Sequence, residues 1–386
     1  MFHEVGATAR VLLIAGTRPE GIKLAPLVRM LKADQRFAAR LLVTGQHPHM
    51  ADLALAEFGL LADSSLRDLP TDIDLSARVG ILLTAIATEI ARQVPQAVVV
   101  QGDTISALAG ALAATYSAVP VVHLEAGLRT YDMTRPFPEE ANRRLISSIA
   151  TLHLAPTRSA RKHLESEGVR SADIAVTGNT AVDALVWALG SANDSVAEAV
   201  PDVPLVGRRV VLVTLHRRES WGEPISQALQ AIRNLVRRCP DVTVVIPMHP
   251  NPVVRDAIRA SSSDVPHLVL VDALPYLTFV RTLRASSLVI TDSGGVQEEA
   301  ATLGVPTVVV RGVTERVEAL QSDNAVLVDA SSAGLLEVAL GLLSRSSRVK
   351  GFQPIFGDGR ASARATERIA GLLGQTNVNI AEFENH

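Results

Sequence analysis

Acidic residues stand within two positions of the ends of two short, mostly apolar runs of the sequence, where they could serve in acid–base chemistry. Asp103 follows Ala97–Gln101, and Glu125 follows Val121–Leu124. A carboxylate held at such a position can remove or supply a proton during a reaction. Asp103 could instead only cap the helix that follows it, which is a common use of Asp. Glu125 ends an apolar run, so capping does not account for it.

A third acidic element begins at Pro138 and suits the start of a helix, with Glu139 and Glu140 in its first turn. Glu139 and Arg143 are four residues apart and would therefore lie on the same side of that helix. The pair could be only an exposed ion pair. It could also add to the acid–base groups of the same half of the chain.

A cationic motif follows the first apolar run. Thr17 and Glu20 have the spacing of a capping box, which predicts a helix beginning here. Arg18 would then lie at the positive N-terminus of that helix, with Lys23 one turn later. Cations at this place are unfavourable unless an anion binds. A surface arginine beside a cap is the alternative, but the cap does not explain Arg18, so we favour anion binding.

A glycine turn follows a later apolar run, Leu288–Thr291. Ser293, Gly294 and Gly295 stand before a helical pattern, where backbone N–H groups can approach a phosphate without interference from side chains. A tight turn could need these glycines for its geometry alone. Glu299 lies one helical turn further on, where a carboxylate could accept a hydrogen bond from a ribose hydroxyl.

Two histidines also follow apolar runs in this half of the chain. His216 comes after Val210–Thr214 and is followed by two arginines, which favours contact with a phosphate over a solvated charge run. His249 follows Val242–Pro247 in the same way. A single histidine is more often structural, so His249 carries less weight.

The elements that must position these residues alternate along the chain. Short β-branched runs alternate with stretches of helical period, which is typical of parallel sheets covered by helices. A first set of expected strands covers Val11–Ala15, Leu41–Thr44, Ala97–Gln101, Val121–Leu124, Thr151–Ala155 and Ile174–Thr177. A second set covers Val210–Thr214, Val242–Pro247, Leu268–Val271, Leu288–Thr291, Val305–Val310 and Ala325–Val328. The stretch between the sets, Gly190–Gly207, is predicted to be a linker, so the chain divides into two doubly wound halves with a cleft between them.

Composition narrows the classes of function. The chain has 386 residues, of which 47% are hydrophobic and 20% charged, and its net charge is −3. These values argue against a disordered chain and give no reason to expect nucleic-acid binding. Cys239 is the only cysteine, which excludes an intramolecular disulfide and a cysteine-built zinc site. The apolar runs are too short for a membrane span, so we expect a soluble cytoplasmic protein without a metal site.

One half therefore offers a phosphate cradle and the other offers carboxylates, a division that suits a nucleotide sugar. With its motifs in order, the sequence closely resembles the non-hydrolysing UDP-N-acetylglucosamine 2-epimerases over nearly its whole length. The motifs of the first half are Gly16-Thr17-Arg18-Pro19-Glu20, Gly102-Asp103-Thr104, Glu125-Ala126-Gly127-Leu128-Arg129-Thr130, Pro138-Glu139-Glu140-Ala141-Asn142-Arg143 and Thr177-Gly178-Asn179-Thr180. Those of the second half are His216-Arg217-Arg218-Glu219-Ser220, Thr291-Asp292-Ser293-Gly294-Gly295-Val296-Gln297-Glu298-Glu299 and Thr314-Glu315-Arg316.

The resemblance implies an α/β protein of GT-B fold that acts as a homodimer without an added cofactor. Its two Rossmann-like domains would cover residues 1–178 and 179–360, the second binding UDP, with a helix over 361–380 packing back on the first. The diphosphate would be held by Arg18, His216, Ser293, Gly294 and Gly295, with His216 also counted as catalytic. Glu299 would hold the ribose and Phe279 would lie near the uracil. Asp103, Glu125 and Glu139 would be the acid–base carboxylates, supported by Lys23, Arg143 and Arg316.

Three positions depart from the family pattern. Gln101 stands where the family usually has His, and an amide cannot take up a proton at neutral pH. Val317 replaces the usual Pro after Thr-Glu-Arg, so that loop is expected to be less rigid. The loop that holds an activating second UDP-GlcNAc in bacterial relatives reads Gln46-His47-Pro48-His49-Met50 here, and His49 replaces the usual Gln or Glu. Gln46, His47 and His249 are the candidate allosteric residues.

The family reaction inverts C2 of UDP-GlcNAc to give UDP-ManNAc by eliminating UDP and adding it back to a 2-acetamidoglucal. Three other activities stay open. A hydrolysing 2-epimerase would release ManNAc and UDP, a GT-B glycosyltransferase would use an acceptor, and a nucleotide-sugar sensor would bind without turnover. The pathway served, either a cell-wall or capsule polymer or an antibiotic, and the carboxylate that removes the C2 proton are not determined by the sequence.

Overall fold

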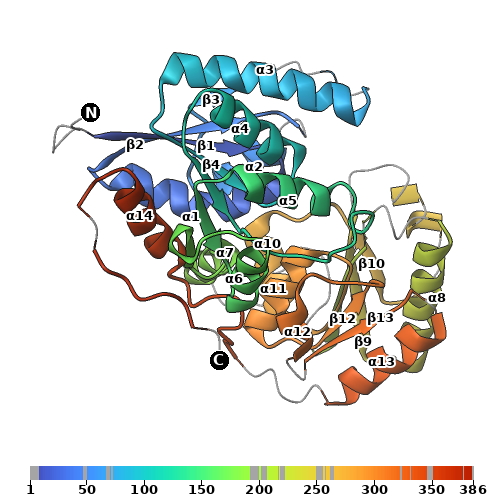
Figure 1. Cartoon of the computed structure of the whole chain (residues 1–386). Coiled ribbons are helices and arrows are strands. Elements are labelled where there is room, and N and C mark those ends of the chain that lie inside the picture. Colours follow the sequence, from blue (N-terminus) through green and yellow to red (C-terminus); the bar gives the residue numbers. More distant parts are fainter. Residues whose placement is uncertain are drawn as a thin grey trace. The chain divides into compact units, whose positions relative to one another are not determined.

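The computed structural model describes residues 8–46, 50–66, 70, 73–191, 200, 207–215, 217, 222–248, 255–256, 258–260, 265–321, 324–330, 332–345, 351–376 and 378–384. Contacts within the chain divide it into two compact units. Unit 1 comprises Met1–Val186 and Phe356–His386, and unit 2 comprises Trp187–Ile355. Each unit is built on its own parallel sheet with flanking helices (Figure 1).

Unit 1 contains a seven-stranded parallel sheet in the order β3-β2-β1-β4-β5-β6-β7. Its strands are β1 (Ala9–Ala15), β2 (Phe37–Val43), β3 (Ser64–Ser65), β4 (Ala97–Gln101), β5 (Val121–Leu124), β6 (Leu152–Ala155) and β7 (Ile174–Val176). Its helices are α1 (Arg18–Ala33), α2 (Met50–Glu57), α3 (Leu75–Gln93), α4 (Ile105–Tyr116), α5 (Glu139–Ile149), α6 (Arg158–Ser166), a 3-10 turn at Ser171–Asp173, and α14 (Ala361–Leu372). Helix α7 (Thr180–Gly190) contains the point at which the chain passes into unit 2.

Unit 2 contains a six-stranded parallel sheet in the order β10-β9-β8-β11-β12-β13. Its strands are β8 (Arg209–Thr214), β9 (Val242–Pro247), β10 (Leu268–Val271), β11 (Ser286–Thr291), β12 (Thr307–Val310) and β13 (Ala325–Val328). Its helices include α8 (Glu223–Arg238), α10 (Tyr276–Ala285), α11 (Gly294–Leu303), α12 (Val317–Gln321) and α13 (Ser332–Arg345). Both sheets therefore have the doubly wound order of a Rossmann fold, as the sequence predicts.

All twelve strands expected from the sequence form, with differences only at their ends. The largest difference is in β2, which begins at Phe37 rather than Leu41 because exposed residues alternate with buried ones in its first half. Strand β3 was not expected, since two serines carry neither an apolar run nor an alternation. The near-continuous burial of the central strands explains why their apolar runs are so easily found.

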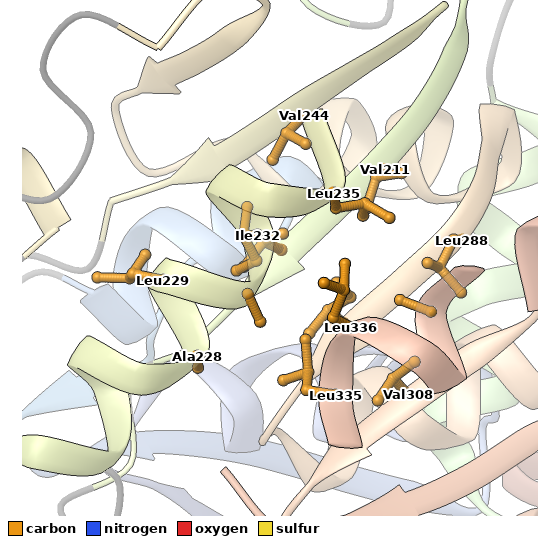
Figure 2. Close-up of a cluster of buried hydrophobic side chains, with 14 of the residues drawn as sticks. Val211, Ala228, Leu229, Ile232, Leu235, Val244, Leu288, Val308, Leu335 and Leu336 are labelled. Carbon is orange, nitrogen blue, oxygen red and sulfur yellow. The ribbon is translucent and has the colours of Figure 1, made fainter. Parts of the chain in front are cut away.

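The core of unit 2 lies on both faces of its sheet. On one face, α8 and α13 direct Ile232, Leu235 and Leu335 toward Val211 and Leu288 of the strands (Figure 2). On the other face, a smaller cluster joins Val210 and Val245 to partly buried Phe279 of α10. Helices on both faces bury most side chains of the central strands β8, β11 and β12 and leave the carboxyl ends of the strands as the edge where polar groups can gather.

In unit 1, α3 and α4 cover one face of the sheet, and α14 packs against α1 (Figure 1). Asp183 of α7 accepts hydrogen bonds from the backbone N–H groups of Ala361 and Ser362, at 3.1 and 2.7 Å, and so caps α14 from outside the helix. Burial raises the pKa of this carboxyl. The helix expected over 361–380 ends at Leu372, because Gly374 takes the left-handed conformation with φ +68°.

In each sheet the strand order reverses next to the first strand, between β1 and β4 and between β8 and β11. Ligands of open α/β sheets bind at such switch points, outside the carboxyl ends of the strands. In the described part of the chain, no helix combines the length and the apolar character needed to cross a membrane.

Candidate active site

Asp103 lies at the carboxyl end of β4 in unit 1 and is held by a buried arginine. The residue that caps α4 is Thr104, whose Oγ1 accepts from the backbone N–H of Ala107 at 3.0 Å. The alternative that Asp103 serves only as that cap is therefore wrong. Instead, Nη2 of Arg143 donates to Oδ2 of Asp103, whose side chain is 20% exposed. This carboxylate is thus fixed beside a cation while part of it stays accessible.

Helix α5 supplies several groups around Asp103. Asn142 Nδ2 donates to the main-chain carbonyl of Asp103 at 2.6 Å, which fixes the backbone of that turn. Arg143 is only 1% exposed, so the alternative of an exposed ion pair on this helix is wrong. Glu139 is the first residue of α5 and is half-buried. Its neighbour Glu140 is fully buried and accepts from two backbone N–H groups of the 128–131 segment.

Glu125 follows β5 and is held from two sides. Lys23 Nζ and Gln101 Nε2 both donate to its Oε2, the amide at 2.7 Å, and all three side chains are buried. The backbone of Glu125 has φ +63°, a left-handed conformation that is costly for a residue other than glycine. Strain of this kind persists where the surroundings impose it and is concentrated at functional sites. Gln101, which replaces the family's usual His, therefore supplies a donor whose charge state does not change with pH.

The turn between β1 and α1 forms the expected cap. Thr17 is the N-cap residue and accepts from the backbone N–H of Glu20 at 3.5 Å. The Glu20 carboxylate turns back to accept from Gly16 N at 3.0 Å and from Thr104 Oγ1 at 2.7 Å. It thereby joins the turn that carries Arg18, the half-buried first residue of α1, to the turn after β4. Burial raises the pKa of Glu20 to about 7.

A neutral histidine pair lies beneath these turns. His123 of β5 is fully buried and its Nε2 donates to the carbonyl of Gly102 at 2.8 Å, since a carbonyl can only accept. Its ring packs edge-on against His153 at 6.4 Å between centroids. Burial lowers the pKa of His123 to about 3 and that of His153 to about 4. Both rings are therefore uncharged at neutral pH. His123 holds the backbone of the turn before Asp103 through Gly102, and His153 packs against His123.

In unit 2 the two strands at the switch point are joined through their last residues. Thr214 Oγ1 and Thr291 Oγ1 lie 2.6 Å apart, and buried Asp292 accepts from the backbone N–H of Arg217 at 2.9 Å. Ser293 is the N-cap residue of α11, and its side chain makes no capping hydrogen bond to that helix among the residues described. The glycine turn is thus a helix N-terminus, as the sequence predicts, and N–H groups at such a terminus are suited to bind an anion.

A buried ion cluster lies against the same turn. Arg316 Nε donates to Glu298 Oε1 at 2.8 Å, and Arg316 Nη1 donates to Glu315. Arg311 Nη1 donates to the other oxygen of Glu315 at 2.8 Å. A Cβ at Gly294 would lie 2.8 Å from Arg316 Cζ, so the guanidinium covers the first residue of α11. A side chain larger than that of glycine at this position would have to displace the guanidinium.

Glu299 and Phe279 lie on neighbouring elements of unit 2. Glu299 is 7% exposed, and its Oε1 accepts from the hydroxyl of Tyr276 at 2.9 Å. Tyr276 is the first residue of α10, and Phe279 lies one turn later on the same helix, partly buried against the strands. Tyr276, Glu298 and Glu315 were not among the predicted site residues. Glu298 lies three residues after Gly295 and Glu315 lies next to Arg316, but neither spacing indicates which side chain the carboxylate contacts.

The remaining candidates are only partly described. Gln46 Oε1 accepts from Ser106 Oγ at 2.7 Å, at the start of α4. His216, His47 and His249 lie outside the described residues. Within the ranges that the structure covers, no group of three or more His, Cys, Asp or Glu side chains is arranged to hold a metal ion.

Two Rossmann-like units, one with two carboxylates at the ends of adjacent strands and the other with a helix N-terminus beside a buried arginine, are the architecture of a GT-B protein. A family model described as UDP-N-acetylglucosamine 2-epimerase matches residues 29–370. The chain belongs to the UDP-N-acetylglucosamine 2-epimerase family.

Relatives and solved structures agree with this assignment. A probable UDP-N-acetylglucosamine 2-epimerase of Ralstonia nicotianae is 40% identical over 368 residues, which cover 93% of this chain and 98% of the relative. The S. aureus MnaA–UDP co-structure has a TM-score of 0.91 at 34% identity, covering 97% of this chain and all of the other. The UDP-GlcNAc 2-epimerase of Neisseria meningitidis bound to UDP-GlcNAc has a TM-score of 0.90 at 35% identity, covering 94% and 100% of the two chains.

Proposed function

We propose that the chain interconverts UDP-GlcNAc and UDP-ManNAc by anti elimination of UDP followed by its re-addition, without net hydrolysis. The observation that carries the proposal is the pair of carboxylates, Asp103 and Glu125, at the ends of the adjacent strands β4 and β5. Each has its own cationic partner, Arg143 for Asp103 and Lys23 for Glu125. These ion pairs hold both carboxylates in fixed orientations at the strand ends, where they could exchange a proton with a bound sugar.

The chemistry of C2 explains why elimination is needed. The hydrogen on C2 is not acidic, because neither C1 nor C3 is a carbonyl carbon. Loss of UDP from C1 together with the C2 proton gives a neutral 2-acetamidoglucal, and return of UDP with a proton on the opposite face of C2 completes the inversion. Such a reaction needs acid–base groups on two faces of the sugar. We propose Asp103 for one face and Glu125 or Glu139 for the other.

Departure of UDP needs positive charge where the diphosphate gains negative charge. In unit 2 we propose that Ser293, Gly294 and Gly295 at the start of α11 bind the diphosphate, together with Arg316. Glu299, oriented by Tyr276, would accept from a ribose hydroxyl, and Phe279 would contact the uracil. In unit 1, Arg18 would contact the diphosphate from the start of α1. Apart from the role of Arg316 at the diphosphate, these roles also follow from the resemblance, which places His216 at the diphosphate as well.

Product analysis tests the proposal. The chain is incubated with UDP-GlcNAc alone and followed by proton and phosphorus NMR. We expect UDP-ManNAc to rise to a constant ratio with UDP-GlcNAc while free UDP stays low. Steady accumulation of ManNAc and UDP would indicate the hydrolysing activity instead. UDP release that depends on an added acceptor would indicate a glycosyltransferase, and UDP-GlcNAc binding without turnover would indicate a sensor.

Two variants test the carboxylates. Asp103→Asn and Glu125→Gln should each lower kcat by about 100-fold or more while UDP still binds, since loss of a general acid or base costs about that much. Asp241→Asn is the matched control, because this carboxylate lies on the surface of unit 2 with 57% of its side chain exposed. Wild-type kcat in both active-site variants would contradict the assignment.

Assembly, cofactor use and location remain predictions of the resemblance. We propose a homodimer that needs no added cofactor and works in the cytoplasm. Sedimentation of the full chain tests the dimer, and turnover in buffer containing a chelator and no nicotinamide tests the second point. Turnover of different UDP-linked 2-acetamido sugars, followed by NMR, would define the substrate range and so reduce the number of pathways that the product could feed.

A further inference from the structure

The segment that follows β12 is fastened to the first turns of α11 by buried polar contacts. Thr314 Oγ1 donates to Gln297 Oε1 at 2.8 Å, and the backbone N–H of Arg316 donates to the same hydroxyl oxygen at 3.2 Å. The ion pairs of Arg316 with Glu298 and Glu315 complete the connection. Glu298, Glu315 and Arg316 are 1%, 3% and 4% exposed. Contacts within the protein, and not a bound ligand, therefore fix the position of the Arg316 side chain.

The position of Arg316 is electrostatically unfavourable by itself. Its guanidinium covers Gly294 at the N-terminus of α11, where the helix dipole already carries positive charge. Glu298 and Glu315 offset this repulsion, and with Arg311 the cluster contains two positive and two negative side chains. Buried ion pairs seldom stabilise a protein more than apolar packing would. A neutral ion cluster at a turn proposed to bind the diphosphate therefore needs a reason other than stability.

The geometry of the guanidinium supplies that reason. Nε and Nη1 are bonded to different carboxylates, which fixes the plane of the group as well as its position. A planar guanidinium held in one orientation can meet phosphate oxygens without losing side-chain freedom when the ligand binds. Fixed donors of this kind stabilise charge that develops on a leaving group, because they need no rearrangement during the reaction.

We propose that Glu298 and Glu315 are positioning residues that hold Arg316 over the N-terminus of α11, so that the site for a nucleoside diphosphate exists before the ligand arrives. The proposal rests on the proposed function, because it takes UDP as the ligand. Neither carboxylate is expected to touch the substrate. Their effect should therefore depend on the two phosphates and should be independent of the nucleoside.

Calorimetric titration with UDP and with uridine, which lacks both phosphates, tests this inference. Glu298→Gln and Glu315→Gln should each weaken UDP binding by about tenfold to hundredfold, the loss expected for a charge-assisted hydrogen bond, while uridine binding changes less than about twofold. A merely structural role would weaken both ligands together. Glu337→Gln on the exposed surface of α13 is the matched control, because it also breaks an Arg–Glu ion pair. This variant should change neither UDP binding nor uridine binding.

Gly294→Ala gives an independent test if a glutamine variant fails to fold. Its methyl group would displace the guanidinium while leaving both carboxylates in place, so it should also weaken UDP binding without weakening uridine binding. Equal losses for UDP and uridine, or unchanged UDP binding in folded variants, would overturn the positioning role. A wild-type chain that binds no UDP would instead refute the proposed function itself, and the two failures are therefore distinguishable.

Discussion

Glu20 should make the stability of unit 1 depend on pH, and Glu20→Gln should remove that dependence. The carboxyl is fully buried between Gly16 and Thr104, and burial raises its pKa from 4.5 to about 7. Because the folded state holds the proton more tightly than the unfolded state, this group's contribution to stability falls as pH rises from 4.5 to 7. Over this pH range the contribution of Glu20 to the free energy of unfolding falls by about 3 kcal/mol, at about 1.4 kcal/mol for each unit of pKa.

Glutamine can keep the same contacts. Its Oε1 can accept from Gly16 N, and its Nε2 can donate to Thr104 Oγ1, since a hydroxyl can also accept. The free energy of unfolding of Glu20→Gln, relative to wild type, should therefore rise by about 2.5 kcal/mol between pH 5 and pH 8. Urea unfolding of both proteins, followed by circular dichroism at the two pH values, measures the difference.

A surface carboxylate provides the control for this experiment. Glu165→Gln on α6 should not reproduce the rise, because the hydrogen bond from Arg161 lowers the pKa of that carboxyl. If Glu20→Gln differs from wild type by the same free energy at both pH values, Glu20 is not protonated at neutral pH. The account of its burial would then be refuted.

Two further predictions concern unit 1, one for a glycine turn and one for the Asp103–Arg143 ion pair. Gly127→Ala should lower the free energy of unfolding in urea by more than about 3 kcal/mol, since its Cβ would lie 2.3 Å from the Ala160 carbonyl oxygen. Gly168→Ala, where φ is similarly positive but the space is open, should lower it by about 1 kcal/mol. Equal losses in the two variants would contradict the steric argument. Arg143→Met should lower kcat by about 100-fold, and adding Asp103→Asn should cost little more because the two residues act as a pair; additive losses in the rate of UDP-ManNAc formation would contradict this.

The fold could be predicted from the sequence because its signals are local. Buried parallel strands are apolar along their whole length, and β4, β5, β9, β10 and β13 have the bounds that their apolar runs predict. The glycine turn and the Thr17 cap are also local patterns, and both form where they were expected. The range 361–380 implied for α14 is too long, because Gly374 takes a left-handed conformation and the residues after it are mostly poor helix formers.

The partners of the site residues could not be predicted in the same way. Whether Asp103 capped a helix or paired with Arg143 depended on α5, which lies about 40 residues further along the chain. Glu298 and Glu315 are ordinary acidic residues in the sequence, and only the packing of the segment after β12 against α11 brings them to Arg316. The roles of the site residues in turnover stay predictions until the variants are measured.

In the proposed reaction UDP leaves and returns while the C2 proton exchanges with solvent. Incubation with UDP-GlcNAc in D2O, followed by proton NMR and mass spectrometry, tests this most directly. The UDP-ManNAc formed should carry deuterium at C2, because the proton added to the glucal comes from a group in exchange with water. Product that retains hydrogen at C2 throughout would contradict it.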